Sequence, residues 1–599
     1  MKRSLWKSDG DVISGMFRST ALAMIFTQLA GVVAGFIDGI ITSRFLGAEA
    51  YSAVSLLGPF TGMVVLLAGF LSTGSQVICT QMIGSGNKDR ANQASSFALI
   101  VAFFLSVLIL LGCVFFPGAL FSVCGMSTAK SPEIYDGMMA YLHGYMIGIP
   151  ALMLIQILGP VIVMDGGKKL FTLSAAVLCV ADVTGDLLNV FVFHGGVLGM
   201  GLATSVSFLI QLGMLATHFF RKKGFFRLDF RCFQPQLWTE IFKAGSPTFV
   251  RKLATILRDL LINRMNLAVA VTTAAIAARG VQNDLNALMF CVGLGIGKTL
   301  LSMSGIYYSS NDHSGLKRLF AESMKTSLLI SGVTCVLFFA CAGPIAGLYT
   351  HTPEGWELAV FSIRCMALGM ILDTLLVALQ NYLQGIRNRK LVNVMNFAER
   401  FFIPVLTAFV LGRLFGSRGI MASLAIGKFL LGILMLGLIC VRNKRFPRCW
   451  EDLMFLPKDF GTSPENIRET QIGSMEDVVR ESAEAERFCL SHGMKSTEAR
   501  WMALFVEEMA GNIFRHGKTK NGRAIRVDYR LFVDGNRIGL SLRDCCGAFD
   551  APRYYREHGT EIDLNHTGIR TVMSRASDIQ YYNTFNSNNL LLYINMGAA

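Results

Sequence analysis

The chain has 599 residues, of which 52% are hydrophobic and only 16% are charged, and its formal net charge is +14. So apolar a composition excludes an ordinary soluble enzyme. The lysines and arginines lie in short loops between apolar runs, not in a basic groove, so we expect no nucleic-acid partner.

Long apolar runs fill residues 19–440 and predict about twelve membrane-spanning helices of roughly 20 residues each. Basic residues gather in alternate loops, among them Lys88, Lys168, Arg221, Lys317, Arg387 and Arg442. Because basic loops stay in the cytoplasm, this bias places both termini on the cytoplasmic side of a plasma (inner) membrane. Similar polar turns follow the second and eighth spans, which indicates two six-helix repeats of the same topology.

The resulting fold class is mainly α, with a smaller α/β domain at the carboxyl end. We divide the chain into a cytoplasmic N-terminus (1–18), a first repeat (19–220), a linker (221–243), a second repeat (244–440), a second linker (441–470) and a soluble domain (471–599).

Three segments carry a family resemblance over residues 10–445. They are "DGIITSRFLGAEAYSAVSL" from Asp38, "DLLNVFVFHGGVLGMGLATSVS" from Asp186 and "ALQNYLQGIRNRK" from Ala378. With the repeat layout, these segments resemble the MATE (multidrug and toxic compound extrusion) family of the MOP flippase superfamily. The resemblance implies export of a small-molecule substrate by alternating access, in antiport with Na+ or H+.

Acidic side chains stand inside the spans of the first repeat, where a charge costs at least about 2.5 kcal/mol unless it has a partner or a function. The resemblance implies a cation-coupling role for Asp38, whereas capping of a helix break is the plainer interpretation. Asp182 and Asp186 lie four residues apart and share a helix face with Asn189. These three residues either complete a cation site with Asp38 or form a solvated helix end.

The second repeat mixes acids with arginines in its seventh and tenth spans. The candidate cavity residues are Arg258, Asp259, Asp373 and Gln380. Two interpretations remain open. The arginines, which include Arg264, pair with Asp259 or Asp373 and hold the bundle together, or they line a cavity that favours anionic substrates.

Beyond residue 470 the pattern is that of a soluble α/β sandwich. Residues 476–492 and 497–516 predict amphipathic helices, and "AIRVDYRLFVDGNRIGLSLRD" predicts a hairpin across an Asp-Gly-Asn turn. The segment "IRTVMSRAS" predicts another helix, and "DIQYYNTFNSNNLLLYINM" predicts a final hairpin.

In the helix "ALFVEEMAGNIFRHG", an acid, an amide and a histidine recur every four residues on one face. This pattern resembles the N-box of the GHKL (histidine-kinase-like) ATPases, in their anti-sigma-factor serine-kinase branch. The resemblance implies a Mg-ATP site made of Glu508 as candidate catalytic base, Asn512 for the magnesium ion, His516, Asp544 for adenine, and the loop glycines Gly547 and Gly568. Cys546 and Ala548 stand at the two glycine positions of that family's first loop, and His566 replaces a glycine of its lid, which argues against nucleotide binding and kinase activity.

The leading hypothesis is therefore an exporter with an appended nucleotide-binding regulatory domain. A flippase of lipid-linked precursors, for which membrane lipid is the partner, is a second hypothesis. A third is a membrane sensor whose tail binds or phosphorylates a cytoplasmic regulatory protein, similar to the antagonists of anti-sigma factors.

Overall fold

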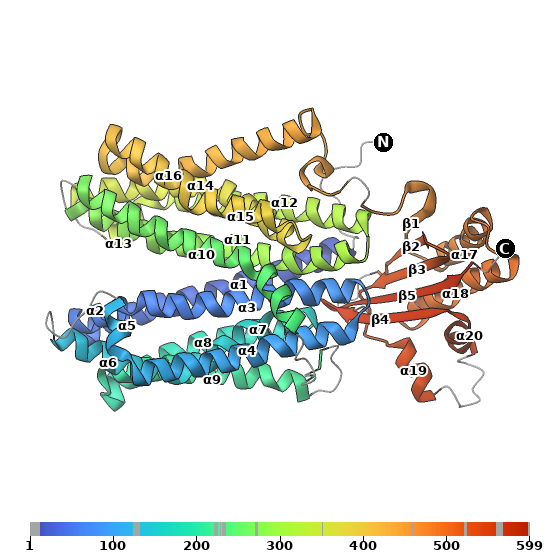
Figure 1. The fold of residues 1–599 in the computed structure, drawn as a ribbon, viewed down its shortest axis with the longest axis horizontal. Coiled ribbons are helices and arrows are strands. Elements are labelled where there is room, and N and C mark those ends of the chain that lie inside the picture. The colour runs from blue at the N-terminus through green and yellow to red at the C-terminus, as the bar shows by residue number, and fades with distance from the viewer. Residues whose placement is uncertain are drawn as a thin grey trace.

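The computed structural model describes residues 12–123, 132–220, 226–227, 229, 235–269, 273–349, 352–457, 460–519, 524–558 and 567–596. Two helical bundles lie side by side, and a sheet with its covering helices lies against one end of both (Figure 1). We call this end the sheet side and the opposite end the open side. Most of the predicted N-terminal segment, part of the first linker and His566 lie outside the described residues.

The first bundle contains α1 (Val12–Ile41), α2 (Ala48–Leu56), α3 (Gly58–Gly84), α4 (Lys88–Phe115), α5 (Pro117–Val123), α6 (Pro132–Tyr145), α7 (Ile149–Met164), α8 (Lys168–Leu188) and α9 (Gly196–Phe220). Glycines let its helices approach closely. A Cβ atom on Gly201 would lie 2.5 Å from the carbonyl oxygen of Tyr141, so α6 and α9 pack backbone against backbone.

The second bundle contains α10 (Pro235–Val269), α11 (Thr273–Ser309), α12 (His313–Ala340), α13 (Ala342–Tyr349), α14 (Pro353–Gly385), α15 (Arg389–Phe397) and α16 (Ile403–Asn443). Helix α16 reverses direction at Gly416, whose φ of 62° is easy for glycine. The Thr407 hydroxyl donates a hydrogen bond to the Ser423 carbonyl at 3.2 Å, which joins the two arms of this hairpin.

Ten segments of the described chain are long and apolar enough to cross a membrane. One of them, Arg389–Asn443, is 55 residues long and folds back at Gly416. Helix α10 is not among the ten, and it carries seven ionisable residues along its 35 positions. About twelve spans were expected. The difference arises because α10 is not among the ten and because the two arms of the α16 hairpin count as one segment.

The carboxyl-terminal domain contains β1 (Ile467–Ile472), α17 (Met475–Ser491), α18 (Ser496–His516), β2 (Val527–Asp534), β3 (Arg537–Asp544), α19 (Ala551–His558), α20 (Thr567–Arg575), β4 (Asp578–Thr584) and β5 (Ser587–Asn595). The strands form an antiparallel sheet in the order β1-β2-β3-β5-β4. The predicted helices and both predicted hairpins are present at these positions.

The two faces of the sheet differ because side chains alternate along a strand. On β2, Val527, Tyr529 and Leu531 are buried in a core shared with α17 and α18. Their neighbours Asp528 and Arg530 point to the opposite face, which meets the helical bundles (Figure 1). The helices thus cover one face of the sheet, and the bundles cover the other.

Candidate functional site

Three carboxylates from two helices gather inside the first bundle. Asp38 lies on α1, and Asp182 and Asp186 lie on α8 and are buried. Asp38 accepts a hydrogen bond from Thr42 at 3.3 Å, and Asp182 accepts one from Ser207 at 3.2 Å. The structure therefore brings the predicted acids together.

Asp186 differs from the other two acids because neither of its carboxylate oxygens has a hydrogen-bond partner within the part of the chain that the structure describes, although both are buried. Asp38 and Asp182 are its electrostatic neighbours, and both carry the same charge. A carboxylate in such surroundings is stable only when a proton or a cation neutralises it. In the described part of the chain, no group of three or more His, Cys, Asp or Glu side chains is arranged to hold a metal ion as it stands.

Asn189 is used locally. Its amide nitrogen donates to the Gly196 carbonyl at 2.9 Å, and its side chain covers Gly199, where a Cβ atom would overlap it. This contact fixes the connection between α8 and α9. Asn189 therefore has a structural role next to the helix that carries Asp182 and Asp186.

The second bundle holds an ion-pair network around Asp373. Lys428 approaches Asp373 at 3.0 Å and Arg400 approaches it at 3.3 Å, while Arg400 also pairs with Glu399 at 2.9 Å. Gln380 donates to Glu399. Arg258 pairs with its neighbour Asp259 at 2.8 Å. The predicted pairing thus forms for Asp259, whereas the partners of Asp373 come from α16 and from the π-helical turn Ala398–Phe402.

Sequence reasoning missed Glu399, Arg400 and Lys428. A signal was present, because "NFAERFF" and "AIGKFLL" place these charges inside long apolar runs. Charges at membrane depth are rare and usually face one another or a cavity.

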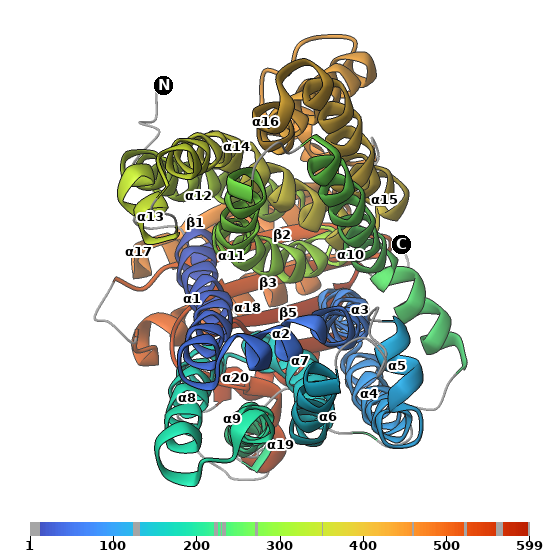
Figure 2. The same ribbon diagram turned by 90° about the vertical axis from the view of Figure 1, so that its left-hand side faces the viewer.

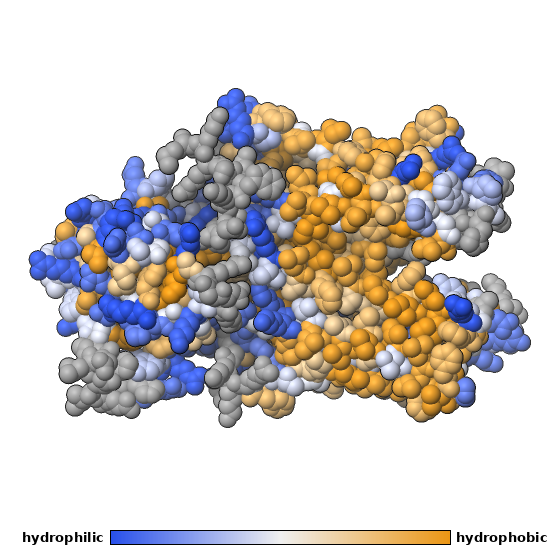
Figure 3. Space-filling view, turned by 180° about the vertical axis from the view of Figure 1, so that it is seen from behind, coloured by the Kyte–Doolittle hydropathy of each residue, from blue (hydrophilic) through white to orange (hydrophobic). Residues whose placement is uncertain are grey.

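The inner helices α1, α3, α10 and α11 lie along the boundary between the bundles (Figure 2). On the sheet side they pack tightly, since a Cβ atom on Gly245 of α10 would lie 2.5 Å from the Phe70 carbonyl oxygen of α3. Gln81 of α3 also donates to the Gly385 carbonyl of α14 at 3.1 Å. On the open side the molecule is hollowed between the two bundles (Figure 3).

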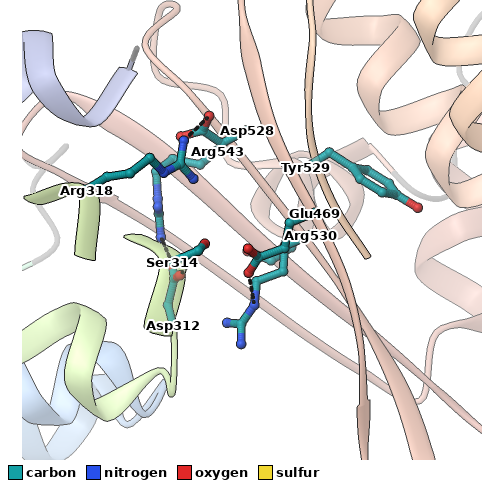
Figure 4. A pocket seen from close by; sticks show the side chains of 9 residues that line it. Asp312, Ser314, Arg318, Glu469, Asp528, Tyr529, Arg530 and Arg543 are labelled. Atoms are coloured by element: carbon teal, nitrogen blue, oxygen red, sulfur yellow. Dashed lines mark hydrogen bonds and ion pairs between the residues drawn. The ribbon is translucent and has the colours of Figure 1, made fainter. Parts of the chain in front are cut away.

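The polar face of the sheet, which carries Arg530 and Arg543, contacts the turn between α11 and α12. Arg530 donates to the carbonyl oxygens of Ser310 and Asn311 at 3.3 and 2.8 Å. Arg543 approaches Asp312 at 3.4 Å in a small polar pocket (Figure 4). Burial alone would raise the pKa of Asp312, but Arg530 and Arg543 hold that pKa below its usual value.

The same domain also contacts the first bundle through its last hairpin. The Phe585 amide donates to the Met164 carbonyl at 2.9 Å, and the Asn586 side chain donates to the Gly166 carbonyl at 3.0 Å. A Cβ atom on Gly86, in the turn between α3 and α4, would overlap Gln580. One rigid sheet therefore contacts turns of both bundles.

The predicted nucleotide residues lie on the helix-covered side of the domain. Glu508, Asn512 and His516 lie on α18, and Asp544 ends β3. The Asp544 carboxylate accepts hydrogen bonds from the Cys546 amide at 2.7 Å and from Asn588 at 2.9 Å. Burial raises the pKa of Asp544.

The loop glycines have unequal surroundings. Gly568, at the start of α20, lies directly against the Glu508 carboxylate, where a Cβ atom would overlap it. Gly547 has open space around its Cα atom, and its carbonyl accepts from Asn588 at 3.1 Å. Cys546 is buried, and its sulfur would lie 2.9 Å from a Cβ atom on Gly517. The loop after β3 is therefore packed against the end of α18.

Comparisons with known proteins bear on the helical bundles. The family model MatE matches residues 23–190 and 247–410, which is more than half of the chain. The chain belongs to this family. As a MATE family transporter, it is a multi-pass membrane protein.

Relatives and solved structures agree with this assignment. The chain is 23% identical to "Multidrug export protein MepA" of Staphylococcus saprophyticus, over 70% of this chain and 91% of that protein. It is 22% identical to an "FAD transporter" of Shewanella oneidensis, over 65% and 86% respectively. A solved outward-facing MATE family transporter superposes with a TM-score of 0.67 at 18% identity, covering 74% of this chain and 97% of that one.

The ion-pair network of this MATE transporter generates a stability prediction. Arg400→Met removes the cation that pairs directly with the buried Glu399 and one of the two cations that pair with Asp373, so we expect the free energy of unfolding to fall by about 3–5 kcal/mol. Arg418→Met is the matched control, because the pair of Arg418 with Glu357 at 3.5 Å is exposed and is worth less than about 1 kcal/mol. Thermal unfolding of the purified variants measures both effects. Equal melting temperatures for the two variants would contradict the prediction.

Proposed function

We propose that this MATE transporter exports small molecules across the plasma membrane in exchange for H+ or Na+. The observation that carries the proposal is Asp186, a buried carboxylate that lies beside Asp38 and Asp182 and has no hydrogen-bond partner among the described residues. Exchange of a proton or cation at this cluster changes the local charge and so couples the gradient to the bundles. Relatives named for multidrug export or multidrug resistance support the substrate class.

The sheet side is the cytoplasmic side in this proposal. The turns that carry Lys88, Lys168, Lys317 and Arg387 all lie at this end of the bundles, where the positive-inside rule places basic loops. Both the docked domain and the tightly packed ends of the inner helices are therefore cytoplasmic, and the hollow faces outward.

Export by alternating access requires the bundles to separate on the cytoplasmic side in another state. The contacts that must break there include Gln81 with Gly385 and Arg18 with Glu322 at 2.5 Å, each of which joins one bundle to the other. Loading of the acid cluster with protons or cations favours one of the two states because the charge of the first bundle changes.

The sheet domain is a regulatory domain in this proposal. It contacts the turn Ser310–Asp312 of the second bundle and the turn Met164–Gly166 of the first. Separation of these turns breaks one of the two sets of contacts, so the docked domain favours the outward-open state. Regulation then requires only a ligand that changes the affinity of docking.

Mg-ATP is the ligand that we propose for this domain. Asp544 and Asn588 would hold the adenine base, and Asn512 with Glu508 on α18 would approach the magnesium ion and the phosphates. The buried hydrogen bonds that fix Asp544 support this arrangement. A cytoplasmic regulatory protein is the partner expected of such a domain.

Neutralisation of the acid cluster tests the antiport proposal. We expect Asp186→Asn and Asp38→Asn each to abolish gradient-driven export, with membrane insertion unchanged, because the variant side chain cannot exchange a proton or a cation. Asp136→Asn is the control, since Asp136 is exposed on α6. Uptake of a panel of anionic and cationic fluorescent dyes by proteoliposomes under an imposed gradient measures the effect. Normal gradient-driven transport by Asp186→Asn would refute the coupling role.

Release of the sheet domain tests the regulatory proposal. The double variant Arg530→Ala and Arg543→Ala removes the docking contacts to the α11–α12 turn, and we expect its initial transport rate to rise several-fold. Arg537→Ala is the matched control. Arg537 lies on the same face of β3 as Arg543, but it pairs with Asp534 at 2.8 Å within the domain. An unchanged rate, with protease susceptibility showing that the domain is undocked, would contradict regulation by docking.

Calorimetric titration of the full-length protein with Mg-ATP tests the nucleotide site. We expect binding by the wild type and its loss in Asp544→Ala and Asn512→Ala. Asp534→Ala, at the exposed end of β2, is expected to bind normally. Absence of wild-type binding at millimolar ATP would mean that the domain acts by docking alone.

A further inference from the structure

The two bundles of this transporter carry opposite charges at membrane depth. The first presents three carboxylates, Asp38, Asp182 and Asp186, on facing parts of α1 and α8. The second presents an excess of cations. In its buried network, Arg400 and Lys428 already neutralise Asp373 and Glu399.

Arg251 adds a further positive charge to this network. Its guanidinium group has no ion pair or hydrogen bond to a described residue, and its electrostatic neighbours are Arg400, Glu399 and Asp373. Because the two acids are already paired, three cations face two carboxylates. One positive charge of the network is therefore left without a counter-ion.

Lys298 is a second cation, and no acidic side chain among the described residues pairs with it. It lies on α11, and its ammonium group donates to the side-chain oxygen of Gln28, on α1, at 3.3 Å. Its charged neighbour is Arg251, which repels it. Two unneutralised cations thus lie near each other on the inner helices of the second bundle.

The two cations lie on α10 and α11. Helix α10 contacts α3 at Gly245, where a Cβ atom would lie 2.5 Å from the Phe70 carbonyl oxygen. Arg251 lies six residues beyond Gly245 toward the open side, the side on which the molecule is hollowed between the bundles (Figure 3). Lys298 lies near the contact of α11 with α1 at Gly295. Both residues are partly exposed.

Unpaired cations at membrane depth are costly, so they persist where water or a ligand compensates them. We infer that the hollow between the two bundles binds a small molecule that carries a carboxylate or phosphate group, held by Arg251 and Lys298. The inference deepens the proposed function by naming its substrate class. An anion at this place forms charge-assisted hydrogen bonds with the guanidinium and ammonium groups, and the acids of the first bundle remain free for the coupling ion.

Binding of matched probes to the purified full-length protein tests the inference. Naphthalene-1-acetate and 1-naphthyl phosphate are the anionic probes, and 1-naphthylmethylammonium carries the same ring with the opposite charge. In phosphatidylcholine nanodiscs we expect an anionic probe to bind at least about tenfold more tightly than the cation. Arg251→Gln and Lys298→Gln should each weaken anion binding by about tenfold or more.

Two control variants separate charge from folding. Arg251→Lys keeps the charge and should retain most of the anion affinity. Arg364→Gln removes a cation of the same bundle that stacks on Phe339 at 5.2 Å, and it should bind like the wild type. Equal affinity for the ammonium probe, or anion binding that survives both Arg251→Gln and Lys298→Gln, would overturn the inference.

Anionic lipid is the other source of the same chemistry. Loss of probe binding when phosphatidylglycerol is added to the nanodiscs would assign the site to a lipid headgroup and overturn the soluble substrate. Because binding is measured without a gradient, it is independent of the antiport proposal. Selective anion binding by a protein that fails to transport would sustain this inference and refute the proposed function.

Discussion

Charge inside a medium of low dielectric constant must be compensated, and this requirement organises the helical bundles. The acids Asp38, Asp182 and Asp186 lie in the first bundle, and Asp186 has no hydrogen-bond partner among the described residues. In the second bundle, Arg400 and Lys428 pair with Asp373, and Arg251 adds a positive charge that no acid of this network neutralises. In the proposals above, the acids of the first bundle bind the coupling cation and the unpaired cations of the second bundle bind an anionic group, so the two places lie in different bundles.

A second constraint acts where the sheet domain meets the bundles. Alternating strand residues commit one face of the sheet to its own helices and leave a polar face that carries Arg530 and Arg543. That face is matched to the carbonyl groups and to Asp312 at the turn between α11 and α12, while the last hairpin reaches the turn at Gly166. The domain is consequently placed to sense, and to resist, relative movement of the two bundles.

Local patterns predicted much of this fold. The helices α17 and α18 begin and end within about one residue of their predicted limits, because amphipathic period and turn residues are local signals. The spacing of Asp182 and Asp186 on one helix face allowed a shared site with Asp38, but it allowed a solvated helix end equally well. The network of Arg400 and Lys428 and the docking of Arg543 on Asp312 were not predicted, because each depends on packing between segments that lie far apart in the sequence.

In the regulatory proposal, the docked sheet domain holds the two bundles together at the sheet side. Spin labels at the exposed residues Ser85 and Lys390, introduced through a non-natural amino acid because the chain has 14 cysteines, report the separation of the bundles there by pulsed electron resonance. We expect one short distance in the wild type, and an added population at longer distance once Arg530 and Arg543 are replaced by alanine. Identical distance distributions in the two proteins would contradict the claim.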